Sequence, residues 1–89
     1  MVKVEYFFSP VCPSCPSARQ LISKVCSKRS DVEYVEVNTY TEEGIERGMS
    51  LNLMAVPAVA VDGILKLIGW PFDEKALNNC INEAKSCTP

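Results

Sequence analysis

The sequence predicts a single α/β domain spanning residues 1–89, with a mixed four-stranded sheet and helices on both of its faces. Three observations support this class. Some segments alternate apolar and polar residues, as strands do, and others repeat apolar residues at helical spacing. Their order along the chain is β-α-β-α-β-β-α. A helix separates the first two strands, which makes them parallel with a right-handed crossover. An Asp-Gly pair separates the last two strands, which makes them an antiparallel hairpin.

The first half of the chain supplies two strands and a long helix. One side of a strand over residues 2–8 carries Val2, Val4, Tyr6 and Phe8. A helix is predicted from Pro13 to about Arg29, because apolar residues recur at helical spacing and proline suits a first helical position. Alternation resumes over residues 31–38, which we interpret as the second strand.

The second half supplies a short helix, a hairpin and a last helix. Thr41 is predicted to cap a helix that runs to about Leu51, weakened by two glycines that each cost roughly 1 kcal/mol relative to alanine. The hairpin strands, residues 58–61 and 64–68, flank the Asp-Gly pair. Asp73 is predicted to cap the last helix. The apolar face of that helix would carry Ala76, Leu77, Cys80, Ile81 and Ala84.

Composition and charge exclude several classes of function. The net charge is −2 and no basic cluster is longer than Lys28–Ser30, so we expect no nucleic-acid partner. No apolar run reaches the roughly 18 residues that span a membrane, and the first residues alternate instead of forming a signal sequence. We expect a monomer in the cytoplasm, where most thiols are kept reduced. Histidine is absent, which excludes Cys-His dyads and Ser-His-Asp triads.

Two cysteines lie where the first strand gives way to the first helix. Cys12 is predicted at the helix N-cap, where unpaired N–H groups and the positive end of the helix dipole stabilise a thiolate. Cys15 follows one turn later, and a separation of about 5–5.5 Å between the two Cα atoms permits a disulfide. We therefore predict that Cys12 attacks a substrate disulfide and that Cys15 resolves the resulting mixed disulfide.

The same pair has other interpretations. A structural disulfide would close a very small loop and add little stability. A zinc site or an iron–sulfur cluster needs further ligands, and the cysteines at positions 26, 80 and 87 form no second C-x-x-C pair. We therefore favour a redox centre, and we predict no metal and no cofactor.

Three motifs resemble the thioredoxin superfamily: "CPSCP" at Cys12–Pro16, "AVPAV" at Ala55–Val59 and "LIGWP" at Leu67–Pro71. The resemblance covers essentially the whole chain and is closest to the small, glutaredoxin-like thioredoxins of archaea. It implies a thioredoxin-like fold in which Pro57 is a cis-proline that faces the cysteines. The activity that it implies is the reduction of protein disulfides.

The resemblance also bears on the remaining cysteines. The first and last helices of this fold pack in parallel, which puts Cys26 and Cys87 at similar depth. These two residues either form a second disulfide, or Cys26 and Cys80 are small core residues while Cys87 frays at the terminus.

Two positions depart from the family's pattern. Thioredoxins usually carry an aromatic residue just before the first cysteine and a buried aspartate six residues before it, whereas this chain has Val11 and Tyr6. The resemblance therefore identifies no proton acceptor for Cys15. The adjacent Glu5 would point to the opposite face of its strand, where we expect it to be solvated or paired at the edge of the sheet.

An apolar surface is expected around Cys12, which suits proteins as substrates. The candidate substrate-binding residues are Val11, Pro13, Val56, Pro57, Gly69 and Trp70. Backbone groups of Val56 are expected to pair with an extended substrate chain in the manner of a β-strand.

The electron donor is inferred from the same surface. Trp70 is expected near the cleft where glutaredoxins hold glutathione, and the long side chain of Arg19 is expected in solvent. The predicted donor is therefore a thioredoxin-reductase-type flavoprotein or another dithiol. Two alternatives stay open: a glutathione-coupled glutaredoxin, and a non-catalytic adaptor that senses redox state.

Overall fold

Seven elements follow one another in the predicted order over residues 2–86, which are the residues that the computed structural model describes. They are β1 (Val2–Phe8), α1 (Cys15–Ser27), β2 (Val32–Asn38), α2 (Glu42–Ser50), β3 (Ala58–Val61), β4 (Ile64–Ile68) and α3 (Glu74–Ser86). The strand order in the sheet is β2-β1-β3-β4. β1 is parallel to β2 and antiparallel to β3, and β4 is antiparallel to β3, so the predicted mixed sheet is confirmed.

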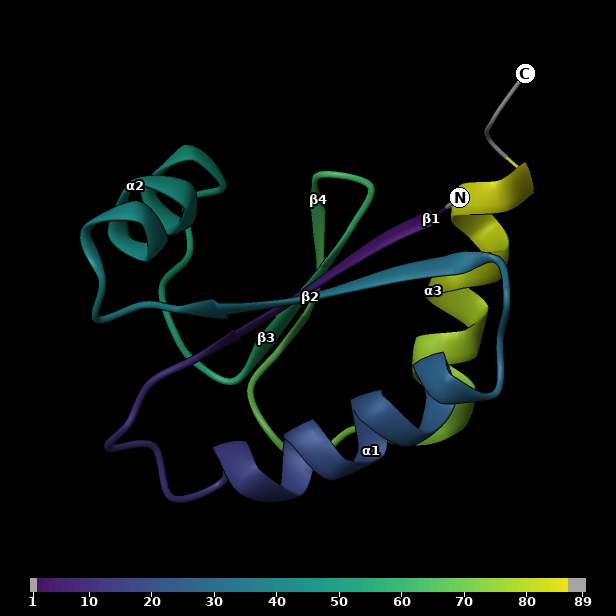
Figure 1. Ribbon diagram of the computed structural model, residues 1–89, viewed down its shortest axis with the longest axis horizontal. Coiled ribbons are helices and arrows are strands. Elements are labelled where there is room, and N and C mark those ends of the chain that lie inside the picture. The colour runs from purple at the N-terminus through teal and green to yellow at the C-terminus, as the bar shows by residue number, and fades with distance from the viewer. Residues whose placement is uncertain (1, 87–89) are drawn as a thin grey trace.

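The sheet separates two hydrophobic cores, with α1 and α3 on one face and α2 on the other (Figure 1). The larger core includes Val4, Tyr6, Ile22, Leu77 and Ile81. The predicted alternation along the first strand is confirmed, because Val2 and Phe8 at its two ends contact this same core. The smaller core is built from Phe7, Ala58 and Ala60 on the opposite face. No described helix combines the length and the apolarity needed to cross a membrane.

Glu5 points to the face of the sheet opposite the cysteines, as expected, but it is neither solvated nor at an edge. β1 is an interior strand, and the carboxylate of Glu5 is buried on the α2 side of the sheet with only 4% of the side chain exposed. Arg47 of α2 donates to both carboxylate oxygens, from Nε at 2.8 Å and from Nη2 at 2.6 Å. The expectation of a solvated or edge position is wrong because pairing of β1 on both sides leaves it no edge, and a buried carboxylate needs a cation.

Gly44 allows α2 to approach the end of β2 closely. The hydroxyl of Thr41 accepts a hydrogen bond from the Gly44 N–H at 3.0 Å, which confirms the predicted cap. A Cβ atom at position 44 would run into the backbone carbonyl of Asn38. Packing therefore requires a glycine that intrinsic helix propensity disfavours.

Two further local predictions are confirmed. Asp62 and Gly63 both have positive φ, at 51° and 81°, as a two-residue turn between β3 and β4 requires. Asp73 accepts a hydrogen bond from the Ala76 N–H at 2.8 Å, which caps the start of α3.

Candidate active site

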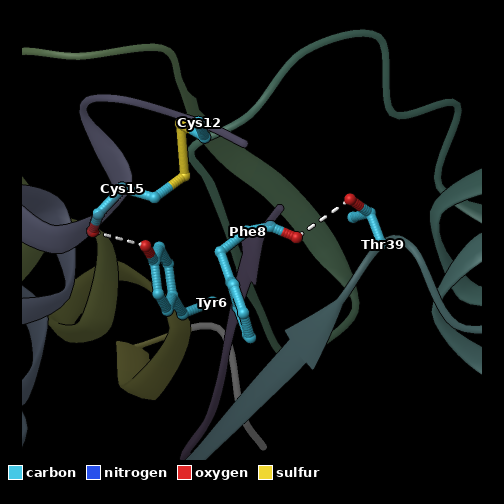
Figure 2. Close-up of a disulfide and its surroundings, with 5 residues drawn as sticks. All are labelled: Tyr6, Phe8, Cys12, Cys15 and Thr39. Atoms are coloured by element: carbon cyan, nitrogen blue, oxygen red, sulfur yellow. Dashed lines mark hydrogen bonds between the residues drawn. A yellow bond between two sulfur atoms is a disulfide. The ribbon is translucent and has the colours of Figure 1, made fainter. Parts of the chain in front are cut away.

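The two cysteines of the C-x-x-C motif form a disulfide at the start of α1 (Figure 2). Their Cα atoms are 5.4 Å apart, within the predicted range. Cys15 is only 4% exposed, whereas Cys12 is partly exposed. An incoming disulfide can therefore reach the sulfur of Cys12 more readily than that of Cys15.

The helix begins later than the sequence analysis predicts. Ser14, not Cys12, occupies the N-cap position, and Cys15 is the first helical residue. Pro16 explains the shift, because it has no N–H to donate to the carbonyl of Cys12. Without this i to i−4 hydrogen bond, the helix does not begin at Cys12. The first i to i−4 bond runs instead from the Ala18 N–H to the carbonyl of Ser14, at 3.1 Å. Cys12 is thus not an N-cap residue, although the disulfide joins it to the N-terminal end of the helix.

The turn that carries Cys12 is fastened at its beginning. The hydroxyl of Thr39 donates to the carbonyl of Phe8 at 2.9 Å (Figure 2). The Thr39 N–H donates to the same carbonyl at 2.9 Å, so the end of β1 is tied to the end of β2. Within the turn, the Cys12 N–H donates to the carbonyl of Ser9 at 3.2 Å. These hydrogen bonds hold the turn that carries Cys12 next to the end of β1.

Tyr6 reaches the cysteine pair from below. Its hydroxyl donates to the carbonyl of Cys15 at 2.6 Å, and the residue is only 1% exposed (Figure 2). Burial raises the pKa of the Tyr6 hydroxyl to about 12, and the charge of Glu36 acts in the same direction. From the sequence, Tyr6 is expected on the apolar side of the first strand, and no contact with Cys15 is predicted for it. The alternation of the first strand, which puts Tyr6 on the helix-covered face, was the signal that pointed to a contact.

A groove of about 460 Å³ runs beside the disulfide. It is lined by Tyr6, Phe8, Ser9, Pro10, Cys12, Cys15, Pro16, Arg19 and Gln20. The side chain of Arg19 is 62% exposed, as expected, and its Nε also lies 2.7 Å from a carboxylate oxygen of Glu36. The Tyr34 hydroxyl donates to the same oxygen at 2.7 Å. The guanidinium at the rim of the groove is therefore already paired.

The candidate substrate-binding residues other than Trp70 lie in the turn around Cys12 and in the two segments that contain Pro57 and Gly69. Val11 and Pro13 are exposed in the turn around Cys12, as the apolar-surface hypothesis requires. The Val56–Pro57 peptide bond is cis, as the resemblance implies. The Gly69 N–H donates to the carbonyl of Pro57 at 2.7 Å, so two of the three motifs lie side by side.

Trp70 does not line the groove beside the disulfide. Its ring packs edge-on against Phe72, with 5.1 Å between the centroids, and borders a separate hollow with Leu21 and Glu74. The cis bond between Trp70 and Pro71, which sequence analysis did not predict, lies in the same segment. Trp70 therefore gives no reason to exclude a small thiol from the groove that the cysteines share.

Two further cysteines, Cys26 and Cys80, lie among the described residues, and neither forms a disulfide within residues 2–86. Cys26 is buried and Cys80 is partly buried, and burial raises the pKa of both. Cys87 lies outside the described residues, so the choice between a Cys26–Cys87 disulfide and free thiols stays a prediction. Among the described residues, no group of three or more potential ligands is arranged to hold a metal ion.

Comparisons with known proteins point to one family. Residues 2–82 match a family model described as a thioredoxin domain. The thioredoxin of Methanocaldococcus jannaschii is 37% identical over 76 residues, which are 82% of this chain and 85% of that protein. A probable thioredoxin of Methanothermobacter thermautotrophicus is also 37% identical, over 93% of this chain and 95% of its own. Thioredoxin f2 of Chlamydomonas reinhardtii has a similar structure, with a TM-score of 0.73 at 21% identity over 98% of this chain and 82% of that one.

Proposed function

Because the chain belongs to the thioredoxin superfamily and is a thioredoxin-like thiol–disulfide oxidoreductase, we propose that it reduces disulfides in proteins through Cys12 and Cys15. The observation that carries the proposal is the disulfide at the start of α1, in which Cys12 is partly exposed and Cys15 is buried. A nucleophile must meet a protein substrate, whereas a resolving thiol needs to meet only its neighbour.

Two displacements complete the reduction. The Cys12 thiolate attacks one sulfur of the substrate disulfide, forms a mixed disulfide and releases the first substrate thiolate. The Cys15 thiolate then attacks the sulfur of Cys12 and releases the second substrate thiolate. Two electrons pass to the substrate, and the Cys12–Cys15 disulfide is left for a donor to reduce.

Val56 and Pro57 are proposed to hold an extended stretch of the substrate. Within residues 2–86, the N–H and carbonyl of Val56 take part in no backbone hydrogen bond, so both are available to a second chain. The neighbouring Gly69 and the exposed Val11 and Pro13 extend this surface around the nucleophile.

The proposed electron donor is a thioredoxin-reductase-type flavoprotein or another dithiol, and the proposed location is the cytoplasm, where such donors keep thiols reduced. Trp70 does not favour a dithiol over glutathione, because it borders a different hollow. The support for a dithiol comes from Arg19, whose pairing with Glu36 opposes the capture of a glutathione carboxylate in the groove.

Turnover of insulin disulfides with dithiothreitol as the electron source tests the proposal. The wild-type chain should accelerate the reduction and the Cys12→Ser variant should not, because the attacking thiolate is lost. A Cys26→Ser variant is the matched control, because that thiol is buried and lies outside the disulfide. Equal rates with the wild-type chain and with Cys12→Ser would favour the non-catalytic adaptor instead.

A further inference from the structure

We propose that Tyr6 is a positioning residue for the resolving step: its hydroxyl holds the start of α1 so that Cys15 stays within reach of Cys12 while their disulfide is open. The inference rests on the dithiol chemistry proposed above and assigns a part in it to a side chain that carries no thiol.

The contact has the geometry of a fixed tether. The acceptor is the carbonyl of Cys15, the first residue of α1, and the donor comes from the interior strand β1. The Tyr6 ring stacks on Phe8 with 5.6 Å between the centroids, and the residue belongs to the buried core between β1 and the helices α1 and α3. Because β1 is paired on both sides, the Tyr6 hydroxyl has little freedom to move. It therefore restrains the start of α1.

The tether matters because, within residues 2–86, no backbone hydrogen bond joins Cys12 to Cys15 or to the rest of α1. When Cys12 carries a substrate, the sulfur–sulfur bond to Cys15 is absent. Pro16 has no N–H, so the helix cannot supply the bond that would join its first turn to the carbonyl of Cys12. Cys12 is held through Ser9 in the turn, and Cys15 is held through Tyr6 and the helix. The rate at which the Cys15 sulfur attacks the Cys12 sulfur depends steeply on how closely and in what orientation the two atoms are held.

The hydroxyl acts by position and not by exchanging a proton. Its pKa of about 12, which burial raises, keeps it neutral at physiological pH. Its hydrogen is directed at a backbone oxygen instead of a sulfur. The role is therefore distinct from that of a carboxylate that would accept the proton of Cys15.

The Tyr6→Phe variant tests the tether, because it removes the hydroxyl and keeps the ring. The reduced protein is mixed with substoichiometric dithiobis(nitrobenzoate), whose thiolate is coloured. Attack by Cys12 releases the first thiolate and leaves the mixed disulfide, and attack by Cys15 on the sulfur of Cys12 releases the second. One stopped-flow trace therefore reports the attacking and the resolving steps separately.

The second release should slow by about 2- to 10-fold in Tyr6→Phe, the factor that loss of one net hydrogen bond gives, while the first stays within about twofold. Tyr34→Phe is the matched control, because it removes a phenolic hydroxyl from the neighbouring strand that bonds Glu36 and not Cys15. It should change neither step. Equal slowing of both steps in Tyr6→Phe, or no slowing of the second, would overturn the inference. A wild-type chain that releases only the first thiolate would contradict the dithiol function itself.

If the Tyr6→Phe variant does not fold, a measurement on the wild-type chain tests the inference instead. The hydroxyl proton of Tyr6, followed by nuclear magnetic resonance, should exchange slowly with water in both the oxidised and the reduced protein. Loss of this protection on reduction would mean that the tether opens with the disulfide, which would overturn the inference.

Discussion

The guanidinium of Arg47 on α2 donates two hydrogen bonds, at 2.8 Å and 2.6 Å, to the carboxylate of Glu5 in the interior strand β1. The two residues are 42 positions apart, and the Glu5 side chain is 4% exposed whereas that of Arg47 is 38% exposed. This pair fastens α2 to the face of the sheet opposite the cysteines, so it should govern stability more than catalysis.

Removing the cation from this pair should destabilise the fold. Arg47→Met leaves the carboxylate of Glu5 buried without a partner, and we expect the free energy of unfolding in urea to fall by about 2 kcal/mol at neutral pH. Lys24→Met is the control, because Lys24 and Glu74 form an exposed pair at 3.5 Å whose loss should cost less than about 0.5 kcal/mol. Equal losses in the two variants would mean that the buried pair contributes no more than a surface one.

Acid should weaken the fold through the same carboxylate. The hydrogen bonds from Arg47 lower the pKa of Glu5 below its usual 4.5, although burial acts in the opposite direction. A group with a depressed folded-state pKa stabilises the fold above its unfolded-state pKa, and the contribution is lost as the pH falls through the folded-state value. The free energy of unfolding should therefore decrease as the pH falls below about 4.5.

The Glu5→Gln variant isolates this contribution. Its free energy of unfolding should depend less steeply on pH over the same range, because the amide does not titrate. Asp31, whose pKa is also lowered by hydrogen bonds from Arg29 and Lys85, leaves part of the slope in place. An acid transition of unchanged steepness in Glu5→Gln would show that Glu5 does not contribute.

The two cysteines should behave differently toward reagents and substrates. The Cys15→Ser variant should accumulate mixed disulfides with protein substrates, because Cys12 still attacks and no thiol resolves the product. In the reduced wild-type chain, iodoacetamide at neutral pH should label Cys12 first, because Cys15 is only 4% exposed. Peptide mapping by mass spectrometry reads out both results, and preferential labelling of Cys15 would reverse the assigned roles.

Glutathione should be a poor electron donor as long as Arg19 is paired. In a hydroxyethyl-disulfide assay coupled to glutathione reductase, we expect turnover far below that of a glutaredoxin run alongside. The Glu36→Gln variant frees the guanidinium, which lies 2.7 Å from the Glu36 carboxylate, and should raise the turnover about fivefold. Tyr34→Phe, which leaves the ion pair intact, is the control. Wild-type turnover equal to that of the glutaredoxin would refute the dithiol donor.

The sequence by itself determined the features that depend on neighbours along the chain. Alternation, helical spacing and the Asp62-Gly63 turn predict the order of the seven elements, because each reflects a local periodicity or backbone conformation. The separation of Cys12 and Cys15 likewise sets a distance that a disulfide can span. Even the late start of α1 has a local cause, the missing N–H of Pro16, which the spacing of apolar residues does not reveal.

Tertiary structure alone decided which distant groups meet. Tyr6 and Cys15 are joined because β1 passes under the start of α1, and Glu5 and Arg47 because α2 crosses the opposite face of the sheet. Arg19 forms an exposed ion pair with Glu36 because β2 carries that carboxylate beside α1. Such contacts depend on how helices pack against the sheet, and that packing minimises the exposure of the whole apolar surface and not of any one segment.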